Sequence, residues 1–270
     1  MLGRSPENMN IPFHMTSAYK YLTCATLKLI AENQTLRFTR ADALNDLYEL
    51  SPFLLPLNWD ELTELSKTNL PAARAVANQA FQKICSSLYL TCFSRSYSTP
   101  QAELMWVHYA NNHTGVCIEV DFEMIRRNEP ESRYCPVGIN YVDSLLDERN
   151  RRSPNSEDLP LFIATTKSRI WEYEDEVRVV MEEESLDSAL YTKSDDEKSI
   201  DVAFDPKSIS KVIFGLRCNP KDIFEVTMQF RSLGLSPTLV RLDIEPLTLR
   251  VVEKPLPSLS SDGTEQEQTK

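Results

Sequence analysis

The chain has 270 residues, 41% hydrophobic and 26% charged, a balance typical of a globular protein. No apolar run approaches the roughly eighteen residues that a transmembrane helix needs, and Met1–Asn8 lacks the layout of a secretory signal. We therefore expect a cytoplasmic protein with no membrane partner. The formal net charge of −11 argues against broad nucleic-acid binding, which depends on Lys and Arg, but leaves room for a nucleotide-like ligand or a protein partner.

Cysteine usage points to the same compartment. The chain has six cysteines and no Cys-x-x-Cys pair. In a chain of this length without a signal sequence, such scattered cysteines predict buried thiols rather than a disulfide framework. They are Cys24, Cys85, Cys92, Cys117, Cys135 and Cys218.

Composition divides the chain into one domain and two tails. Residues 1–15 and 254–270 offer little to bury, and the second tail is rich in Pro, Ser, Glu and Gln, which predicts disorder. Residues 16–253 are predicted to form a single domain. Within it, the polar stretches 143–160 and 182–199 are candidate surface loops.

Period-two alternation and short apolar runs predict the strands. They are expected at 36–39, 88–94, 116–122, 212–214, 239–242 and 247–252. In the third, Val116, Ile118, Val120 and Phe122 are predicted to point inward.

Capping signals predict the helices. Thr23 is a candidate N-cap for a helix through Asn33, and residues 60–85 read as helical with a break near Pro71. Further helices are expected from Thr99-Pro100 to about residue 112 and from Asn219-Pro220 to Gly234. Helices and strands mix without strict alternation, which predicts a single α+β domain with a mixed, mostly antiparallel sheet and flanking helices.

The segment from Trp171 to Val180 carries the strongest functional signal. If it is extended, Trp171, Tyr173, Val177 and Val179 share a core face, and Glu172, Glu174, Glu176 and Arg178 share the other. Three carboxylates on one face repel each other unless water or a positive group lies opposite. Two interpretations stay open: a solvated face with Arg178 as counter-charge, or a pocket centred on Glu176.

Three other segments are candidate site elements. Arg217 precedes a helix start, where free N–H groups favour anions; alternatively, Gly215 permits a tight turn and Arg217 pairs with an acid. Trp106, His108 and Tyr109 sit on one helix, as core residues or as part of a pocket. Asn45–Glu49 reads as a turn or as one side of a pocket. His108 and His113 are five apart, which is not the spacing of a helical metal pair, so no metal site is expected.

An ordered set of motifs carries a family resemblance. The motifs are Tyr19-Lys20-Tyr21, Leu36-Arg37-Phe38, Asn45-Asp46-x-x-Glu49, Cys92-Phe93-Ser94, Met105-Trp106-x-His108-Tyr109, Trp171-x-Tyr173-Glu174-x-Glu176-x-Arg178 and Ile213-Phe214-Gly215-Leu216-Arg217. Over roughly residues 17–220 the chain resembles the bacterial domain-of-unknown-function family 2971. It departs from the family pattern at Leu47, where Pro is frequent, and at Val177, where an aromatic residue is common.

A more distant similarity concerns layout. Mono-ADP-ribosyltransferase-like domains carry a basic or aromatic residue on an early strand, a hydroxyl or aromatic residue on a middle strand and a glutamate on a late strand. Tyr19, Lys20, Ser94, Glu174 and Glu176 occur in that order. The similarity implies NAD as a substrate, with the glutamate holding the nicotinamide ribose and a basic residue holding the pyrophosphate.

The sequence therefore leaves two main hypotheses. The first is a nucleotide-using transferase or NAD glycohydrolase, with Glu176 and Glu174 as catalytic residues. Its substrate-binding residues would be Tyr19, Lys20, Ser94, Trp106, His108, Tyr109, Arg178 and Arg217. The second is a non-enzymatic ligand- or protein-binding effector in phage defence or stress response. A metal-dependent hydrolase using Glu119, Asp121, Glu174 and Glu176 is a third alternative.

Overall fold

The computed structural model describes residues 15–44, 59–97, 102–128, 134–145, 148 and 159–256. The expected turn at Asn45–Glu49 and the expected helix start at Thr99-Pro100 lie outside these ranges. So do most of the polar stretch 143–160 and nearly all of both expected tails.

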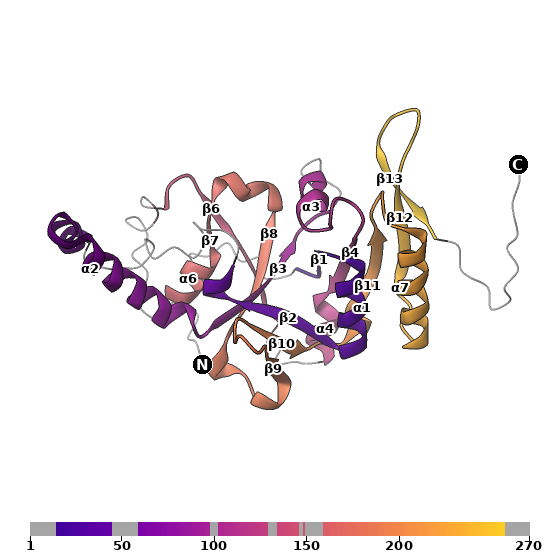
Figure 1. Ribbon diagram of the computed structural model, residues 1–270. Helices are drawn as coiled ribbons and strands as arrows, with labels where there is room; N and C mark the ends of the chain where they lie inside the picture. Colours follow the sequence, from indigo (N-terminus) through magenta and orange to yellow (C-terminus); the bar gives the residue numbers. More distant parts are fainter. Residues whose placement is uncertain are drawn as a thin grey trace, which may run out of the picture.

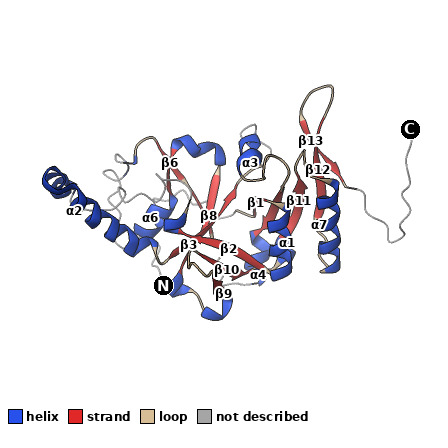
Figure 2. Cartoon of the chain, viewed as in Figure 1, coloured by secondary structure: helices blue, strands red, loops and turns tan. Residues whose placement is uncertain are grey.

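Helices surround a large sheet (Figures 1 and 2). The α-helices are α1 (Cys24–Asn33), α2 (Trp59–Cys85), α3 (Ala102–His108), α4 (Phe122–Asn128), α6 (Leu159–Thr165) and α7 (Pro220–Ser232). Short 3-10 helices are η1 (Ala41–Ala43), η3 (Arg169–Glu174), η4 (Glu183–Ser185), η5 (Ser188–Leu190) and η6 (Pro206–Ser208). The strands are β1 (Ser17–Leu22), β2 (Thr35–Arg40), β3 (Leu88–Ser94), β4 (Val116–Asp121), β5 (Pro136–Gly138), β6 (Asn140–Val142), β7 (Thr166–Ser168), β8 (Glu176–Glu182), β9 (Tyr191–Lys193), β10 (Ser199–Ala203), β11 (Ile209–Phe214), β12 (Thr238–Ile244) and β13 (Val251–Pro255).

The main sheet is mixed and mostly antiparallel, as predicted. Its path runs β13-β12-β11-β4-β1-β3-β2-β10-β9, and β8 with β5 joins at β3. Among the described strands of this sheet, the β11–β12 pairing alone is parallel. A separate parallel pair joins β6 to β7. The α+β prediction is confirmed.

The sheet splits beside β3. One edge of β3 pairs with β8 along its whole length. The other edge meets β1 at Tyr19↔Ser94 and then β2 at Thr39↔Leu90 and Arg40↔Tyr89. Because β1 and β2 share this edge, the backbone of β3 between Ser94 and Leu90 is left without a strand partner on that side. The candidate site lies at this opening.

Side-chain alternation gives the sheet a core on each face. On one face, Ile118, Val177 and Phe214 belong to the largest core cluster, together with Leu27 of α1 and Phe230 of α7. On the other face there are two smaller clusters. One packs around α6, with Leu88, Leu90, Phe162 and Ile163, and the other packs around α3, with Tyr21, Met105, Trp106 and Cys117.

Local capping signals placed the helices well. The Thr23 side chain accepts a hydrogen bond from Thr26 N, and α1 buries Leu27, Ile30 and Ala31, as predicted. The Asn219 side chain caps α7, with Pro220 in its first turn, and the chain leaves that helix at Gly234 with φ +69°. The predicted break in residues 60–85 is also confirmed. It lies at Asn69, whose backbone is not helical and whose side chain accepts from Ala72 N.

Several strand boundaries differ from the prediction. β4 ends at Asp121, because the Asp121 carboxylate accepts from Met124 N and starts α4 at Phe122. The strand expected at 247–252 begins only at Val251, since Glu245 to Arg250 form the hairpin turn. β13 then continues to Pro255, two residues past the predicted domain end. The expected loop 182–199 contains β9, which pairs with β10.

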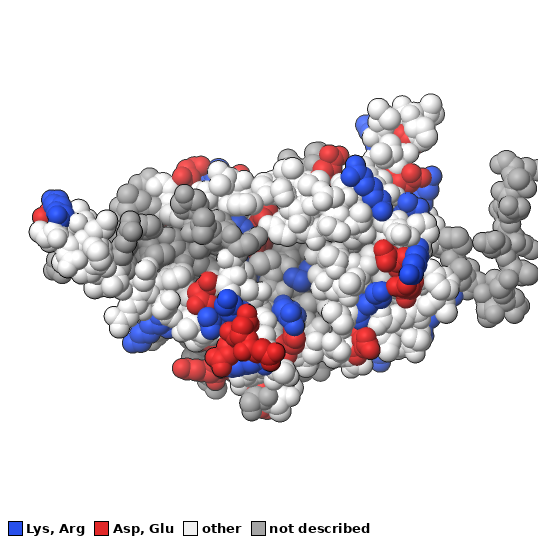
Figure 3. Space-filling model, viewed as in Figure 1, with Lys and Arg blue, Asp and Glu red and all other residues white. Residues whose placement is uncertain are grey.

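On the face drawn in Figure 3, acidic and basic side chains lie in mixed groups, the largest of them acidic with basic side chains beside it. Within the described residues, no helix combines the length and apolar character needed to cross a membrane.

Candidate functional site

The segment predicted to be extended from Trp171 changes conformation at Asp175. Arg169–Glu174 is a 3-10 helix, Asp175 has φ +43°, and β8 begins at Glu176. The expected core face is therefore confirmed for Val177 and Val179 but not for Trp171 and Tyr173, which are half-buried. The solvated-face interpretation is wrong for Glu174, Glu176 and Arg178, which are buried.

Two carboxylates and two cations form a buried network there. Arg178 donates to both oxygens of Glu176, at 2.7 Å from Nε and 3.0 Å from Nη2. Lys167 Nζ on β7 lies 2.9 Å from Glu176 Oε2 and 2.5 Å from Glu174 Oε2. Burial opposes the charge on Lys167, but the two carboxylates outweigh it and raise its pKa above the usual value. Burial also raises the pKa of Glu176, against the effect of Lys167.

The two carboxylates differ in how completely they are occupied. A carboxylate offers about four lone-pair positions. Glu176 already accepts three hydrogen bonds from Arg178 and Lys167, and the Cys92 thiol lies beside it as a further donor. Glu174 accepts two, from Lys167 and from Tyr109 Oη at 2.6 Å. Glu174 therefore retains more capacity to bind a ligand.

This network forms one wall of a small pocket. The lining side chains are Tyr19, Lys20, Tyr21, Leu44, Cys92, Phe93, Ser94, Met105, Tyr109, Lys167, Glu174 and Glu176. The pocket is lined by residues of β1 and β3 beside the opening between these strands, and by Met105 of α3. Its cavity of about 130 Å³ is smaller than the roughly 300–1,000 Å³ of typical ligand pockets, so it suits one moiety of a larger ligand.

Lys20 occupies the opening in the sheet. Its Nζ donates to Thr91 Oγ1 at 2.9 Å and to the Cys92 carbonyl at 2.8 Å, which satisfies the unpaired edge of β3. Within the described residues it forms no ion pair, and burial lowers its pKa from the usual 10.5. An ammonium has three donors, so one remains for a ligand. Lys20, Lys167 and Arg178 also exceed the two carboxylates by one positive charge, which favours an anionic group.

The tyrosines supply aromatic walls and one weakly bonded donor. Tyr19 packs on Tyr97 with ring centroids 4.6 Å apart, and Tyr21 meets Trp106 edge-on at 5.2 Å. The Tyr21 hydroxyl is buried, and within the described residues its partner is the Cys117 thiol, a weak hydrogen-bonding group. A ligand atom that accepts from Tyr21 would therefore make a stronger hydrogen bond.

Six predicted site residues line this pocket: Tyr19, Lys20, Ser94, Tyr109, Glu174 and Glu176. Arg178 lies behind Glu176, fully buried, so it positions that carboxylate rather than facing the pocket.

Three further predicted residues also do not line it. Trp106 is a core residue that stacks on His113, with ring centroids 5.7 Å apart. His108 is exposed, with its ring 6.2 Å from that of Tyr109. Arg217 is also exposed, and its backbone N–H donates to the His113 carbonyl. Because β4 and β1 separate β11 from β3, the loop after β11 lies away from the pocket.

Sequence reasoning missed Lys167, Cys92 and Tyr141. Lys167 bridges the two glutamates, and Tyr141 Oη accepts from Glu176 N at 2.8 Å. Their positions follow from the pairing of β3 with β8 and of β6 with β7, which bring distant segments together. In the sequence, the one indication of this site residue was its position: Lys167 lies four residues before Trp171, the start of the acidic motif.

The remaining predictions concern metal and thiols. Within the described residues no group of three or more His, Cys, Asp or Glu could hold a metal ion. The four acids proposed for a metal hydrolase do not form such a group, and Glu119 instead accepts hydrogen bonds from Ser17 and Tyr19. Of the cysteines, Cys24, Cys85, Cys117 and Cys218 are buried as predicted, whereas Cys92 is half-buried and Cys135 is exposed.

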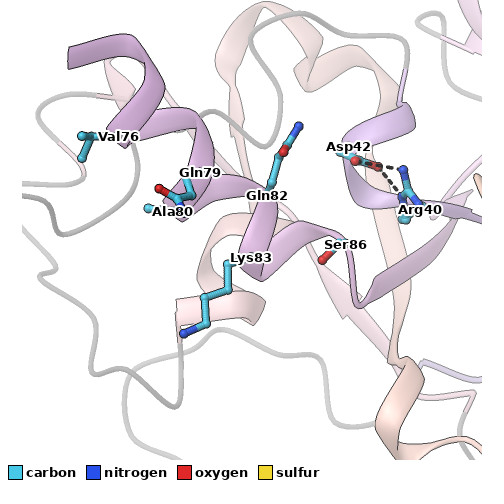
Figure 4. Close-up of a pocket in the computed structure, with 8 residues that line it drawn as sticks. All are labelled: Arg40, Asp42, Val76, Gln79, Ala80, Gln82, Lys83 and Ser86. Carbon is cyan, nitrogen blue, oxygen red and sulfur yellow. Dashed lines mark hydrogen bonds and ion pairs between the residues drawn. The ribbon is translucent and has the colours of Figure 1, made fainter. Parts of the chain in front are cut away.

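A second, wider hollow lies beside α2. Figure 4 shows Arg40 and Asp42 held together at one side, with Lys83 directed away from them. Arg40 also donates to the Glu197 carbonyl, so its charge and donors are already engaged. This hollow offers no convergent unpaired group, and the pocket at Lys20 remains the candidate site.

Comparison with known proteins bears on this site. Residues 105–179 match the family model described as Protein of unknown function (DUF2971). The resemblance predicted from the sequence is confirmed over this segment, which holds Tyr109, Lys167, Glu174 and Glu176. The other wall of the pocket, from β1 and β3, lies outside the match. No curated protein and no solved structure gives a match, and the similarity to ADP-ribosyltransferase-like domains is not confirmed.

Proposed function

We propose that the pocket binds a nucleotide-like ligand such as NAD, and that the protein acts on it as an ADP-ribosyltransferase-like enzyme or NAD glycohydrolase. The observation that carries the proposal is the convergence, on one cavity, of two buried carboxylates, tyrosine rings and a lysine that forms no ion pair with the described residues. Lys20 would hold a phosphate oxygen, because an ammonium without a counter-ion binds such a group strongly. The tyrosine rings would pack against the flat nicotinamide.

The chemistry assigned to the carboxylates is electrostatic. When the bond between nicotinamide and ribose breaks, positive charge develops on the ribose, and a fixed carboxylate nearby stabilises it. Water then adds to the ribose in a glycohydrolase, giving ADP-ribose, nicotinamide and a proton. Glu176, fixed by Arg178 and Lys167, stands at the centre, and Glu174 has the more open lone pairs.

Labelled NAD tests the activity directly. We expect wild-type protein to release nicotinamide or to label an acceptor protein or nucleic acid, and Glu176→Gln to reduce the rate by about 100-fold or more. Glu225→Gln makes the same chemical change in the surface pair with Lys28 and should keep the wild-type rate. Absence of turnover by wild type, with candidate protein and nucleic-acid acceptors present, would sink the enzymatic proposal.

One observation favours a non-enzymatic ligand-binding effector. Glu176 is largely occupied by Arg178 and Lys167, as a structural carboxylate would be. Thermal shift against a nucleotide panel separates the two functions, since a ligand that binds only the folded state raises the melting temperature. A nucleotide that stabilises the protein but is never consumed would support the effector, with phage defence or stress response as its context.

A further inference from the structure

Two cysteines far apart in the sequence lie in contact beside the sheet. Cys24 is the first residue of α1, and Cys218 is the second residue before α7. Their Sγ atoms are 3.6 Å apart, and both side chains are buried. The helices α1 and α7 pack against each other (Figure 1), so the contact belongs to a fixed interface.

We propose that Cys24 and Cys218 are a redox pair, which a peroxide oxidises to a reversible disulfide. The 3.6 Å between the sulfur atoms must shorten to about 2.05 Å, which requires side-chain rotation and a small adjustment of the helix ends. Neither cysteine belongs to the pocket network, and the proposal does not depend on the function assigned to the pocket.

The surroundings assign each sulfur a role. Cys24 is in the first turn of α1, where free backbone N–H groups favour a thiolate. The hydrogen bond with Cys218 lowers the pKa of Cys24, and the same bond raises the pKa of Cys218. Cys24 is therefore the attacking thiol and Cys218 the resolving thiol.

The reaction balances in two steps. The Cys24 thiolate attacks one oxygen of hydrogen peroxide and breaks the O–O bond, which gives a sulfenic acid and, after protonation, water. The Cys218 thiol then displaces the hydroxyl from the Cys24 sulfur, which forms the S–S bond and a second water. Two electrons pass from the two thiols to the peroxide, and a dithiol reductant reverses the change.

The disulfide would tie the structure together beside the pocket. Cys24 follows β1 by two residues, and β1 carries Tyr19, Lys20 and Tyr21. The bond would close a loop between α1 and α7 that spans most of the chain. Because a cross-link over a long loop restricts the unfolded chain, the oxidised form should be more resistant to heat.

Peptide mapping of the full chain tests the proposal. After treatment with hydrogen peroxide and alkylation of free thiols, we expect a Cys24–Cys218 cross-linked peptide, reversed by dithiothreitol. The melting temperature should rise by roughly 5–15 °C. Cys24→Ser and Cys218→Ser should each abolish both changes, whereas Cys85→Ser, at a buried thiol in the other core, should abolish neither.

Two outcomes of this experiment would contradict a Cys24–Cys218 redox pair. Oxidation of the exposed Cys135 with no Cys24–Cys218 cross-link would overturn the proposal. So would a cross-link that forms without raising the melting temperature, since it would then belong to unfolded molecules. If a serine variant is too unstable to purify, the Cys85→Ser protein still tests the proposal. Because it keeps both Cys24 and Cys218, it should form the Cys24–Cys218 cross-linked peptide.

Discussion

Replacing Arg178 by methionine is expected to lower the free energy of unfolding by about 3–5 kcal/mol. Arg178 is fully buried and donates to both oxygens of Glu176 and to the Ala164 carbonyl. Without it, Glu176 keeps the bond from Lys167 but loses both guanidinium donors while remaining buried. Urea unfolding measures the loss as a lower transition midpoint.

A surface pair provides the matched control. Arg37 makes two hydrogen bonds to Asp201, but its side chain is 65% exposed, so Arg37→Met should cost at most about 1 kcal/mol. Combining Arg178→Met with Glu176→Gln should recover part of the loss, since the buried charge then disappears while Lys167 keeps Glu174. Equal losses for Arg178→Met and Arg37→Met would show that burial of the pair does not matter.

Features set by neighbouring residues were predictable from sequence. The N-caps Thr23 and Asn219 and the stop at Gly234 placed α1 and α7 correctly, because each signal acts within one helical turn. The alternation in 88–94 likewise reflects a strand with one core on each face. Half of the pocket was also predicted: six of its twelve lining residues, Tyr19, Lys20, Ser94, Tyr109, Glu174 and Glu176, are site candidates by sequence.

The failures come from contacts across long sequence separations. The alternation from Trp171 to Glu174 suggested a strand, but Glu174 is held by Tyr109, Lys167 and the Ser94 hydroxyl, which bonds its carbonyl at 2.6 Å. These contacts favour a 3-10 turn that the local sequence does not predict. Burial of the acidic face also depends on Lys167, which comes from β7 and forms ion pairs with two carboxylates at once.

Arg217 illustrates the limit of a local motif. Its sequence context, a glycine after a buried strand and a proline at a helix start, describes the loop correctly. Strand order, which no local motif contains, puts two strands, β4 and β1, between that loop's strand and β3. The residue type therefore made Arg217 a candidate for an anion contact, but the strand order places Lys20, and not Arg217, at the pocket.

Gly115→Ala is expected to destabilise the fold by about 3 kcal/mol and to weaken any ligand of the pocket. A Cβ on Gly115 would lie 2.2 Å from the Leu22 carbonyl oxygen and 3.0 Å from that of Ala110. Both contacts are with backbone, so no side chain can rotate away. Leu22 ends β1, and displacing it would shift the strand that carries Lys20 and Tyr21.

Gly234→Ala is the control for this substitution. Gly234 has open space around it, and its cost comes only from φ +69°, which should amount to about 1–2 kcal/mol. Urea unfolding of both variants, with thermal shift in the presence of a stabilising nucleotide, separates the effects. Gly234→Ala should keep the ligand-induced shift, because the backbone of this turn bonds to Gln229, Phe230 and Arg231 of α7, which do not line the pocket. A Gly115→Ala protein as stable as Gly234→Ala would mean that β1 moves freely at Leu22, and the rigid placement of Lys20 beside β3 would then be wrong.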